Sequence, residues 1–546
     1  MSMCCFPLSE KVNLKRQKKM TSFCVLLMAG AAVAVDLPVI VPAPREMKVG
    51  GGMYVIEPQI RYSMADWHDF DRVGQALSEM KKTVVRDASF PAEGYRLKVM
   101  ADGVAIAAAD AAGEFYALQT LRQLAVADGT NAVSLACCEI ADWPAYRWRG
   151  LLIDEARHFF GKDIVKRILD QMAVHKLNVL HWHLTDDQGW RLEIPGMPEL
   201  IKYGSRRPES VKYGAVARWL PPKHALSYET DGQPYGPYFY TQTEIAEIRA
   251  YAKERHITIV PEIELPGHAR AFLAAYPELA CKGETLPRVP RVYWSIEEDV
   301  MCVGNEALLP RLERIFDAVC ELFPDSPYIH IGGDECPRSR WKNCPKCQAR
   351  MKAEGIATED GLQTWCTSRM VRYLEKKGRR AVGWDEVLSG DVPVSTIGMT
   401  WRTGRGDGAG THYVTTAEAV VRGYEIVMTP MDFCYHSKSQ GLVGDPYPYY
   451  SPWGMPLTLE KAYAFDPVAG ISRQDRMKII GGQACVWGEA VWNVFDFEWK
   501  TWPRACATAE ALWLGDAKPG YADFRKRMEQ HRRRLLARHV NCAPLP

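Results

Sequence analysis

The stretch GLLIDEARHFFGKDIVKRILDQMAVHKLNVLHWHL, residues 150–184, reads as a strand, a helix and a second strand. Its outer segments, 150–154 and 178–184, are apolar runs of the kind found in strands that are buried in a parallel sheet. Between them, apolar residues recur every three or four positions, as they do along one face of a helix. This order predicts a β-α-β unit with two parallel strands.

The same alternation continues toward the C-terminus. Thr241-Gln-Thr-Glu244 has capping-box spacing and predicts a helix to about Arg255, followed by a strand over 257–263. Five further apolar runs bring the number of predicted strands to eight: 328–332, 380–384, 396–400, 424–428 and 478–482. Eight strand–helix units predict an α/β fold of the (β/α)8 type, a TIM barrel.

A smaller α/β unit precedes the barrel. Residues 95–100 and 104–108 alternate like paired strands, and 111–124 has the apolar spacing of a helix. This unit contains no cluster of catalytic residue types. The predicted organisation is a signal peptide over 1–34, a small N-terminal α/β domain over 35–144, and the barrel with C-terminal helices over 145–546.

The N-terminus has the features of an export signal. A basic stretch over 11–19 precedes an apolar run over 23–35, which contains the small residues of a cleavage site, Ala32-Val-Ala34. The run is shorter than the ~20 residues that span a bilayer, so we expect removal rather than anchoring. The start codon is Met1 or Met20. The mature protein is expected to be periplasmic, surface-associated or secreted, without a stable membrane span.

Composition excludes two classes of protein. Among the 546 residues, 68 Lys and Arg nearly balance 66 Asp and Glu, so bulk positive charge offers nothing for nucleic-acid binding. A hydrophobic content of 47% is too high for a disordered chain. The chain therefore folds, and its partner is not a nucleic acid.

The cysteines permit more than one interpretation. Three of the 16 lie in the predicted signal peptide, and the odd number that remains leaves at least one thiol unpaired. Cys281 and Cys302 flank a loop and are the favoured disulfide. Cys344-Pro-Lys-Cys347, with Cys336 nearby, resembles half of a zinc site, but a complete site needs four ligands. We prefer a disulfide that closes a loop, or free thiols, to a zinc site, and we expect no metal or cofactor.

The most specific chemical signal is Asp334-Glu335, which follows His330-Ile-Gly-Gly at the end of a predicted strand. Active sites of TIM barrels lie at these strand ends. Two adjacent carboxyl groups cannot flank a sugar from opposite sides, which argues against both ordinary two-carboxylate glycosidase schemes. The pair fits a scheme in which the substrate supplies its own nucleophile, one carboxylate orients that group and the other moves the proton.

Other residues at the strand ends have structural interpretations as well. His181 and His183 on a buried strand are more often hydrogen-bonded core residues than metal ligands. Asp154 and Arg157 could form a structural ion pair, because buried charges are rarely unpaired. Asp385 and Glu386 could cap the following helix. Tryptophans at three strand ends, in contrast, indicate an aromatic-walled pocket: Trp384, Trp401 and Trp487.

Five ordered segments resemble the β-N-acetylhexosaminidases of glycoside hydrolase family 20: 147–160, 181–191, 261–268, 330–335 and 481–489. The likeness covers nearly the whole mature chain, because the small α/β unit resembles the family's N-terminal domain. It implies an exo-acting, retaining hydrolase that removes terminal non-reducing β-linked N-acetylglucosamine, or N-acetylgalactosamine, from glycans.

The resemblance also implies roles for individual residues. Glu335 would be the general acid and later the base for water, while Asp334 would hold the acetamido N–H so that an oxazolinium ion forms. Asp186 and His268 would be a supporting dyad that positions Glu335. Six residues would bind the sugar, with the aromatic ones around the acetamido group: Arg149, Trp384, Trp401, Tyr435, Trp487 and Glu489.

One position departs from the family pattern. The family commonly has Tyr-x-Asp where this chain has Tyr435-His436-Ser437. The acidic position resembles one that contacts outer sugar hydroxyls, so the choice between gluco and galacto sugars stays open, with His436 or a loop residue as a substitute.

Two alternatives remain at this stage. His181, His183, His268 and Asp334 could form the site of a metal-dependent amide hydrolase on the same barrel, although Glu335 would then have no role. A catalytically silent glycan-binding protein is the other alternative. The linkage, the natural glycan, the release of disaccharide units and the oligomeric state are left open.

Overall fold

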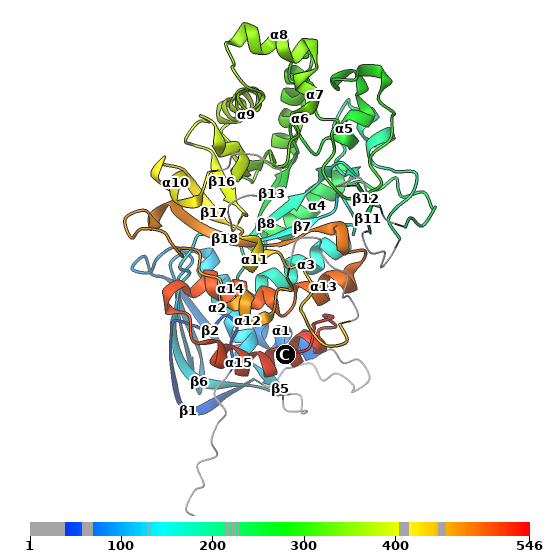
Figure 1. The fold of residues 1–546 in the computed structure, drawn as a ribbon. Helices are drawn as coiled ribbons and strands as arrows, with labels where there is room; N and C mark the ends of the chain where they lie inside the picture. Colours follow the sequence, from blue (N-terminus) through cyan, green and yellow to red (C-terminus); the bar gives the residue numbers. More distant parts are fainter. Residues whose placement is uncertain are drawn as a thin grey trace, which may run out of the picture. The chain divides into compact units, whose positions relative to one another are not determined.

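The protein was analysed as a computed structural model that describes residues 39–56, 69–127, 132–212, 218–220, 225–227, 229–402, 414–445 and 455–546 (Figure 1). The predicted signal peptide lies outside these residues. Every helix in the described ranges is too short or too polar to cross a bilayer.

Eight parallel strands close into a barrel, which confirms the predicted TIM barrel. The strands are β7 (Trp148–Asp154), β8 (Val179–His183), β13 (Thr258–Glu262), β14 (Tyr328–His330), β15 (Arg380–Trp384), β16 (Ile397–Thr400), β17 (Glu425–Met428) and β18 (Ile479–Val486). The register pairs His183 of β8 with Asp154 of β7 on one side and with Glu262 of β13 on the other. The carboxyl ends of these strands therefore lie at one level.

Helices surround the barrel as expected from the strand–helix alternation. Thr241 and Glu244 form the predicted capping box at the start of α4, whose Ile245 and Ile248 are buried. The helices are α3 (Lys162–Val174), α4 (Gln242–Lys253), α5 (Arg270–Ala275), α6 (Leu308–Leu322), α7 (Ser339–Lys342), α8 (Pro345–Glu354), α9 (Glu359–Lys376), α10 (Thr416–Val421), α11 (Met431–Cys434), α12 (Leu459–Tyr463), α13 (Val494–Thr501), α14 (Arg504–Leu514) and α15 (Tyr521–Ala537). Short strands β9 (Thr185–Asp186), β10 (Gly189–Trp190), β11 (Arg218–Leu220) and β12 (Ala225–Ser227) lie in the loops.

In its described residues, the N-terminal unit is a sheet of six strands with two helices. Its strands are β1 (Glu46–Ile56), β2 (Lys82–Arg86), β3 (Tyr95–Met100), β4 (Gly103–Ala108), β5 (Val126–Ala127) and β6 (Val133–Asp142), ordered β1-β6-β3-β4-β2 with β5 beside β6. The predicted β3–β4 hairpin and the helix α2 (Ala111–Leu124) are confirmed. The sequence analysis missed α1 (Asp69–Glu79), which Gly74 weakens as a helix by propensity.

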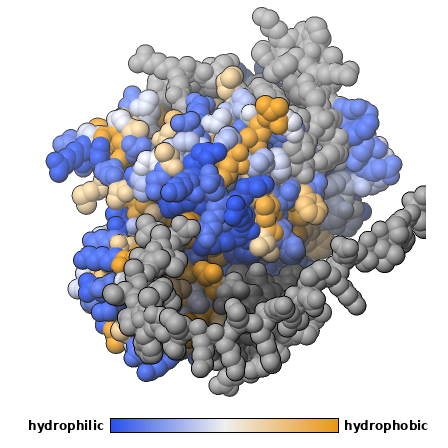
Figure 2. Space-filling model, turned by 90° about the horizontal axis from the view of Figure 1, so that it is seen from below, coloured by the Kyte–Doolittle hydropathy of each residue, from blue (hydrophilic) through white to orange (hydrophobic). Residues whose placement is uncertain are grey.

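The core of this sheet includes two residues of α14, a helix of the barrel domain. Tyr116 of α2 contacts Trp513 of α14, with ring centroids 5.3 Å apart, and Trp513 also packs among the apolar side chains of the sheet. Residues 38–546 accordingly form one compact unit. On the side seen from below, the part not covered in grey is mainly hydrophilic, and its hydrophobic residues form small groups rather than one broad patch (Figure 2).

Candidate active site

A small pocket of about 50 Å³ opens at the carboxyl end of the barrel. Seven of the eight strands contribute to it through the segments that follow them. The lining residues are Arg157 after β7, Asp186 after β8, His268 after β13, Asp334 and Glu335 after β14, Trp401 after β16, Met431 and Tyr435 after β17, and Trp487 and Glu489 after β18. The predicted convergence of polar strand ends is therefore present.

Two glycines bring the acidic pair into this pocket. Gly332 and Gly333 have φ of +59° and +101°, in the left-handed region that favours glycine. A Cβ on Gly332 would lie 1.8 Å from a carboxylate oxygen of Glu264, and one on Gly333 would lie 2.3 Å from Val387. The turn after β14 consequently requires glycine at both positions before the carboxyl groups emerge.

Two residues of the pocket have strained backbones. Glu335 has φ of +43° and His268 has φ of +44°, a region that residues with a side chain rarely adopt. Such strain persists only where the surrounding structure enforces it, and it is concentrated at functional sites. Both residues belong to the set that the sequence analysis selected.

His268 lies between the acidic pair and a second pair of carboxylates. Its Nδ1 is 3.2 Å from Asp186 Oδ1 and 3.3 Å from Asp187 Oδ2. Its Nε2 is 3.6 Å from Glu335 Oε2 and 3.7 Å from Asp334 Oδ2. The predicted contact between Asp186 and His268, directed at Glu335, is present, and Asp187 adds a second acceptor that the sequence analysis did not select.

These contacts determine the charges of His268 and Asp186. Burial opposes ionisation of His268, but Asp186 and Asp334 outweigh it and raise the pKa of His268 well above its ordinary value. Burial likewise opposes ionisation of Asp186, yet Arg157 and His268 hold the pKa of Asp186 well below its usual range. The imidazolium of His268 and the carboxylate of Asp186 therefore form a charged pair beneath the acidic pair.

Asp334 has the opposite shift. Burial, only partly offset by His268, raises the pKa of Asp334 to about 8, and the Glu386 and Glu335 carboxylates act in the same direction. Burial of this carboxyl therefore disfavours its ionised form in the free pocket. A group that donates a hydrogen bond to this carboxyl would favour the ionised form.

Aromatic rings form one side of the pocket. The rings of Trp401 and Tyr435 are nearly parallel, with centroids 6.3 Å apart and an interplanar angle of 17°. Trp487 meets Tyr435 edge to face at 6.0 Å. Such surfaces suit the apolar face of a sugar ring.

Trp384 was predicted to form part of the pocket wall, but it does not line this pocket. It is 1% exposed, its Nε1 donates to Glu262 Oε1 over 2.9 Å, and its ring lies 5.5 Å from that of Trp487. Trp384 therefore packs against Trp487 and does not line the pocket itself.

Arg149 was predicted to bind sugar hydroxyls, and this prediction is wrong. Its guanidinium is fully buried at the opposite end of the barrel, where it donates to Glu93 Oε2 over 2.7 Å, to Lys176 O over 2.7 Å and to Tyr116 Oη over 3.1 Å. The physical reason is its position as the second residue of β7, whose carboxyl end is Asp154.

Arg157 occupies the place that was expected for Arg149. Its guanidinium is 2.9 Å from Asp154 Oδ2 and 2.8 Å from Asp186 Oδ2, and it lies 5.5 Å above the ring of Trp487. The structural ion pair with Asp154 thus exists, and the same side chain also lines the pocket beside Glu489. Its position three residues beyond the end of β7 was the signal that could have identified it.

The residues after Tyr435 turn away from the pocket. Ser437 is 4% exposed, and its carbonyl accepts a hydrogen bond from Lys500 over 2.9 Å. The ring of His436 is buried with Nε2 3.3 Å from Thr508 Oγ1 on α14. His436 therefore does not substitute for the family's acidic residue in this structure.

The histidines of the alternative metal site belong to the barrel core. His181 Nε2 is 3.1 Å from Glu262 Oε2, His330 Nδ1 is 2.7 Å from Glu262 Oε1, and His183 also contacts Glu262. This confirms the core interpretation of His181 and His183. The proposed metal set is not brought together, because His181 points to Glu262 while His268 faces the acidic pair.

Comparison with known proteins identifies the family. The model of the glycosyl hydrolase family 20 catalytic domain matches residues 146–516, and that of the family's domain 2 matches 37–143. A beta-hexosaminidase of Porphyromonas gingivalis is 38% identical over 83% of this chain and 55% of its own length. One of Akkermansia muciniphila is 32% identical over 82% of this chain and 84% of its own length.

Solved structures agree with these matches. A family 20 exo beta-N-acetylglucosaminidase of Vibrio harveyi, in complex with N-acetylglucosamine, has a TM-score of 0.78 at 29% identity and covers 92% of this chain and 78% of its own. A mutant beta-hexosaminidase of Streptomyces plicatus in complex with its product GlcNAc has a TM-score of 0.75 at 27% identity, covering 94% and 98%. The chain spans 55% and 64% of the P. gingivalis and Vibrio furnissii relatives. With this pocket, this barrel and these matches, the chain belongs to glycosyl hydrolase family 20.

Proposed function

We propose that this chain is an exo-acting β-N-acetylhexosaminidase that removes terminal non-reducing β-linked N-acetylglucosamine from glycans. The observation that carries the proposal is the adjacent pair Asp334 and Glu335, which share one aromatic-walled pocket with His268 behind them. Family membership and the sugar bound in two related structures support the same conclusion. N-acetylgalactosamine is the second sugar to be tested.

The reaction proceeds through the substrate's own acetamido group. Its carbonyl oxygen attacks the anomeric carbon, the glycosidic bond breaks, and Glu335 gives its proton to the departing oxygen. The resulting oxazolinium ion is opened by water, which adds to the anomeric carbon while Glu335 takes back a proton. Two inversions at this carbon leave the anomeric configuration retained.

The remaining pocket residues orient the substrate and stabilise the charge that develops during the reaction. Burial disfavours the ionised form of Asp334, and the acetamido N–H that donates to it favours that form, so any proton on Asp334 passes to solvent water and the carboxylate balances the developing positive charge. His268 and Asp186 are positioning residues, since His268 lies 3.6 Å from Glu335. Arg157 and Glu489 line the same pocket, and we assign them to the hydroxyls of the terminal sugar.

The test is a Glu335→Gln variant assayed with an aryl β-N-acetylglucosaminide. Loss of general acid catalysis predicts a fall in kcat of about 10²–10⁴-fold, with circular dichroism unchanged. Glu254→Gln, an exposed position at the end of α4, is the matched control and should retain full activity. Wild-type rates in Glu335→Gln would overturn the assignment.

A second experiment addresses the nucleophile. A thiazoline mimic of the oxazolinium ion should inhibit the enzyme, and an aryl 2-deoxyglucoside should not be cleaved at a comparable rate. Equal cleavage of the 2-deoxy sugar would show that the acetamido oxygen is not the attacking group. An aryl β-N-acetylgalactosaminide and a lacto-N-biose glycoside in the same panel measure the consequence of Ser437.

We also propose that the protein is exported. The support is the basic stretch over 11–19 followed by the apolar run over 23–35. N-terminal sequencing of the mature protein from cell fractions is the test. A mature chain that begins at about residue 35 outside the cytoplasm is expected, and an unprocessed chain in the cytoplasm would contradict the proposal.

A further inference from the structure

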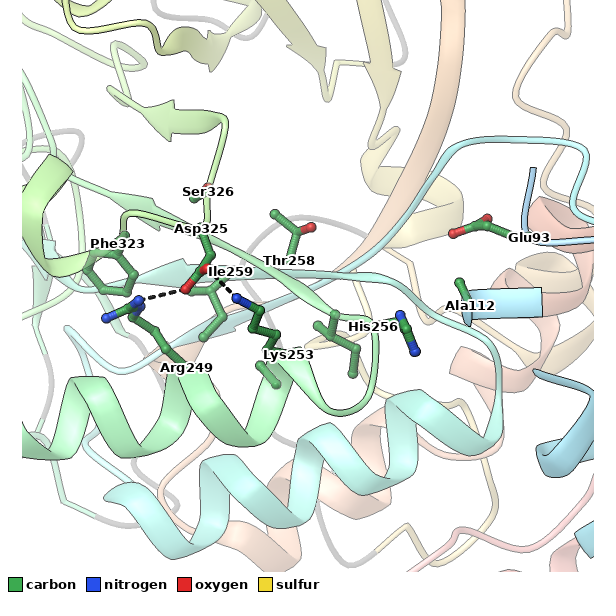
Figure 3. Close-up of a pocket in the computed structure, with 12 residues that line it drawn as sticks. Glu93, Ala112, Arg249, Lys253, His256, Thr258, Ile259, Phe323, Asp325 and Ser326 are labelled. Atoms are coloured by element: carbon green, nitrogen blue, oxygen red, sulfur yellow. Dashed lines mark hydrogen bonds and ion pairs between the residues drawn. The ribbon is translucent and has the colours of Figure 1, made fainter. Parts of the chain in front are cut away.

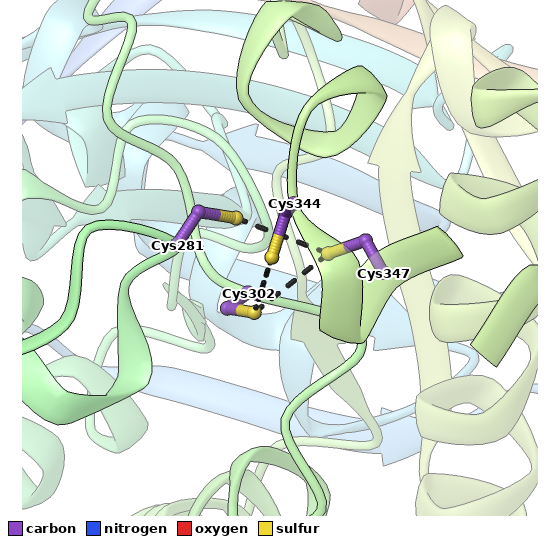
Figure 4. A group of neighbouring side chains, drawn as sticks. All are labelled: Cys281, Cys302, Cys344 and Cys347. Carbon is purple, nitrogen blue, oxygen red and sulfur yellow. Dashed lines mark hydrogen bonds between the residues drawn. The ribbon is translucent and has the colours of Figure 1, made fainter. Parts of the chain in front are cut away.

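Four cysteines gather outside the pocket, two from the loop before the acidic pair in sequence and two from the loop after it (Figure 4). Cys281 Sγ is 3.8 Å from Cys347 Sγ, and Cys302 Sγ is 3.6 Å from Cys344 Sγ and 3.7 Å from Cys347 Sγ. All four sulfur atoms lie within 4.8 Å of one another. Cys336, which the sequence analysis placed near this group, is not part of it.

Neither the expected disulfide nor any other joins these residues, since Cys281 and Cys302 are free thiols. A disulfide would bring two sulfurs to about 2.05 Å and leave the other pair separate. The observed spacing is that of ligands around one ion. Four thiolates at about 2.3 Å from a tetrahedral zinc are separated from one another by about 3.8 Å.

The backbone around the cluster is built for close approach. An antiparallel bridge between Ala280 and Met301 joins the two segments that carry Cys281 and Cys302, each cysteine being the residue after a bridged one. Gly304 lies against the Cys344–Cys347 turn so closely that a Cβ there would be 2.2 Å from Lys346 O. The Gly304 N–H donates a hydrogen bond to the sulfur of Cys347.

The N-terminus of α8 lies at the cluster and would stabilise negative charge on the sulfur atoms. Cys344 is its N-terminal cap residue and Pro345 its first residue, so the positive end of a ten-residue helix faces the sulfurs. A helix N-terminus stabilises the thiolate form of a cysteine, which is the form that metals bind.

We propose that Cys281, Cys302, Cys344 and Cys347 bind one zinc ion as a structural tetrathiolate site. Because the protein supplies all four ligands, no position remains for a water or a substrate, and the ion takes no part in hydrolysis. Cys344-x-x-Cys347 is the half-site recognised in the sequence, and the other half comes from residues more than 40 positions upstream.

The ion would fix two loops of the active site. Met301, next to Cys302, donates from its N–H to Pro266 O over 3.0 Å, within the loop that carries His268. Trp341 Nε1 donates to Met301 O over 2.9 Å, within the segment that connects Glu335 to Cys344. The cluster thus joins the loop after β13 to the loop after β14, and it should affect the stability of this region more than the chemical step.

The test begins with metal analysis of the full chain, purified without added metal and without reductant. About one zinc per chain is expected in the wild type, and less than about 0.1 in the double variant Cys344→Ser/Cys347→Ser. The matched control is Cys320→Ser, a half-buried thiol on α6 outside the cluster, which should keep its zinc. Removing the ion should lower Tm, and Zn²⁺ but not Mg²⁺ should restore it.

Should the double variant fail to fold, the wild type itself supplies the readout. Titration with an organomercurial thiol reagent should release the zinc, detected with a chromogenic chelator, as the four cysteines react. Three results would overturn the proposal: disulfides in place of the metal, reduced thiols that do not take up added Zn²⁺, or iron as the bound metal.

Discussion

The cavities at the two ends of the barrel differ in volume and in chemistry. The larger cavity lies at one end, and the reactive side chains lie at the other. At the amino end lies a cavity of about 370 Å³, against about 50 Å³ for the pocket at the carboxyl end. Yet the charges in the larger cavity are paired, with Asp325 2.6 Å from Arg249 and 2.9 Å from Lys253 (Figure 3). The smaller pocket holds adjacent carboxyl groups, a strained backbone and a perturbed pKa. Chemistry, rather than space, identifies the site.

Two arginines on one segment show the same contrast. Arg149 and Arg157 lie eight positions apart, and both are buried and paired with carboxylates. The partner of Arg149 is Glu93 of the small domain, whereas Arg157 faces the pocket. Arg149 therefore joins the barrel to the N-terminal unit, whereas Arg157 is available to a ligand in the pocket.

The largest effect that would sharpen this comparison is expected at Asp334. Asp334→Asn keeps the shape of the side chain but cannot ionise to balance the positive oxazolinium ion, so kcat should fall by about 10²–10³-fold. Steady-state kinetics with an aryl β-N-acetylglucosaminide measures it. Asp325→Asn at the amino end is the matched control, and a comparable loss there would break the comparison.

The next effect separates the two arginines. Arg157→Lys keeps the charge but loses the bidentate fork, and hydrogen bonds to charged groups are worth about 1.5–3 kcal/mol, so kcat/KM should fall roughly 10–100-fold. Arg149→Lys should instead lower Tm and leave kcat/KM within about twofold at low temperature. Kinetics and thermal melts of both variants are the measurement. An exchange of the two phenotypes would reassign the residues.

A smaller effect concerns pH and stability. The pKa of Asp334 is raised in the folded state, so the folded protein binds more protons than the unfolded chain between about pH 4 and pH 8, and this contribution to stability is lost as pH rises through about 8. Asp334→Asn removes the loss. The Tm of the variant relative to wild type should therefore rise by about 1–2 °C from pH 5 to pH 8.5. A constant or falling difference would show that the shift is absent.

The smallest effect is expected at the amino-end cavity. Lys253 is exposed and paired with Asp325, which is also partly exposed, and such surface pairs contribute about 0–1 kcal/mol. Lys253→Met should leave kcat/KM within about twofold and Tm nearly unchanged. A tenfold loss of activity would show that this cavity takes part in the function.

Local pattern predicted the barrel strands, several of the helices and the family, but not α1 of the N-terminal unit. The strand–helix alternation predicted the barrel, the Thr241 capping box predicted α4, and the β3–β4 hairpin and α2 were found at their predicted positions. These succeed because hydrophobic periodicity and capping depend on residues within a few positions of one another. The glycines before Asp334 and Glu335 are local in the same sense, since the turn that they permit directly carries the acidic pair.

Tertiary structure alone decided three other matters. The first is which end of the barrel Arg149 and Arg157 face, and the second is which cysteines lie beside Cys344 and Cys347. The third is how far the pKa of Asp334 rises. All three depend on residues that are distant in the sequence. The physical reason is common to the three. Strand register, metal geometry and electrostatics act through distances in space, and the chain sets these only when its barrel closes.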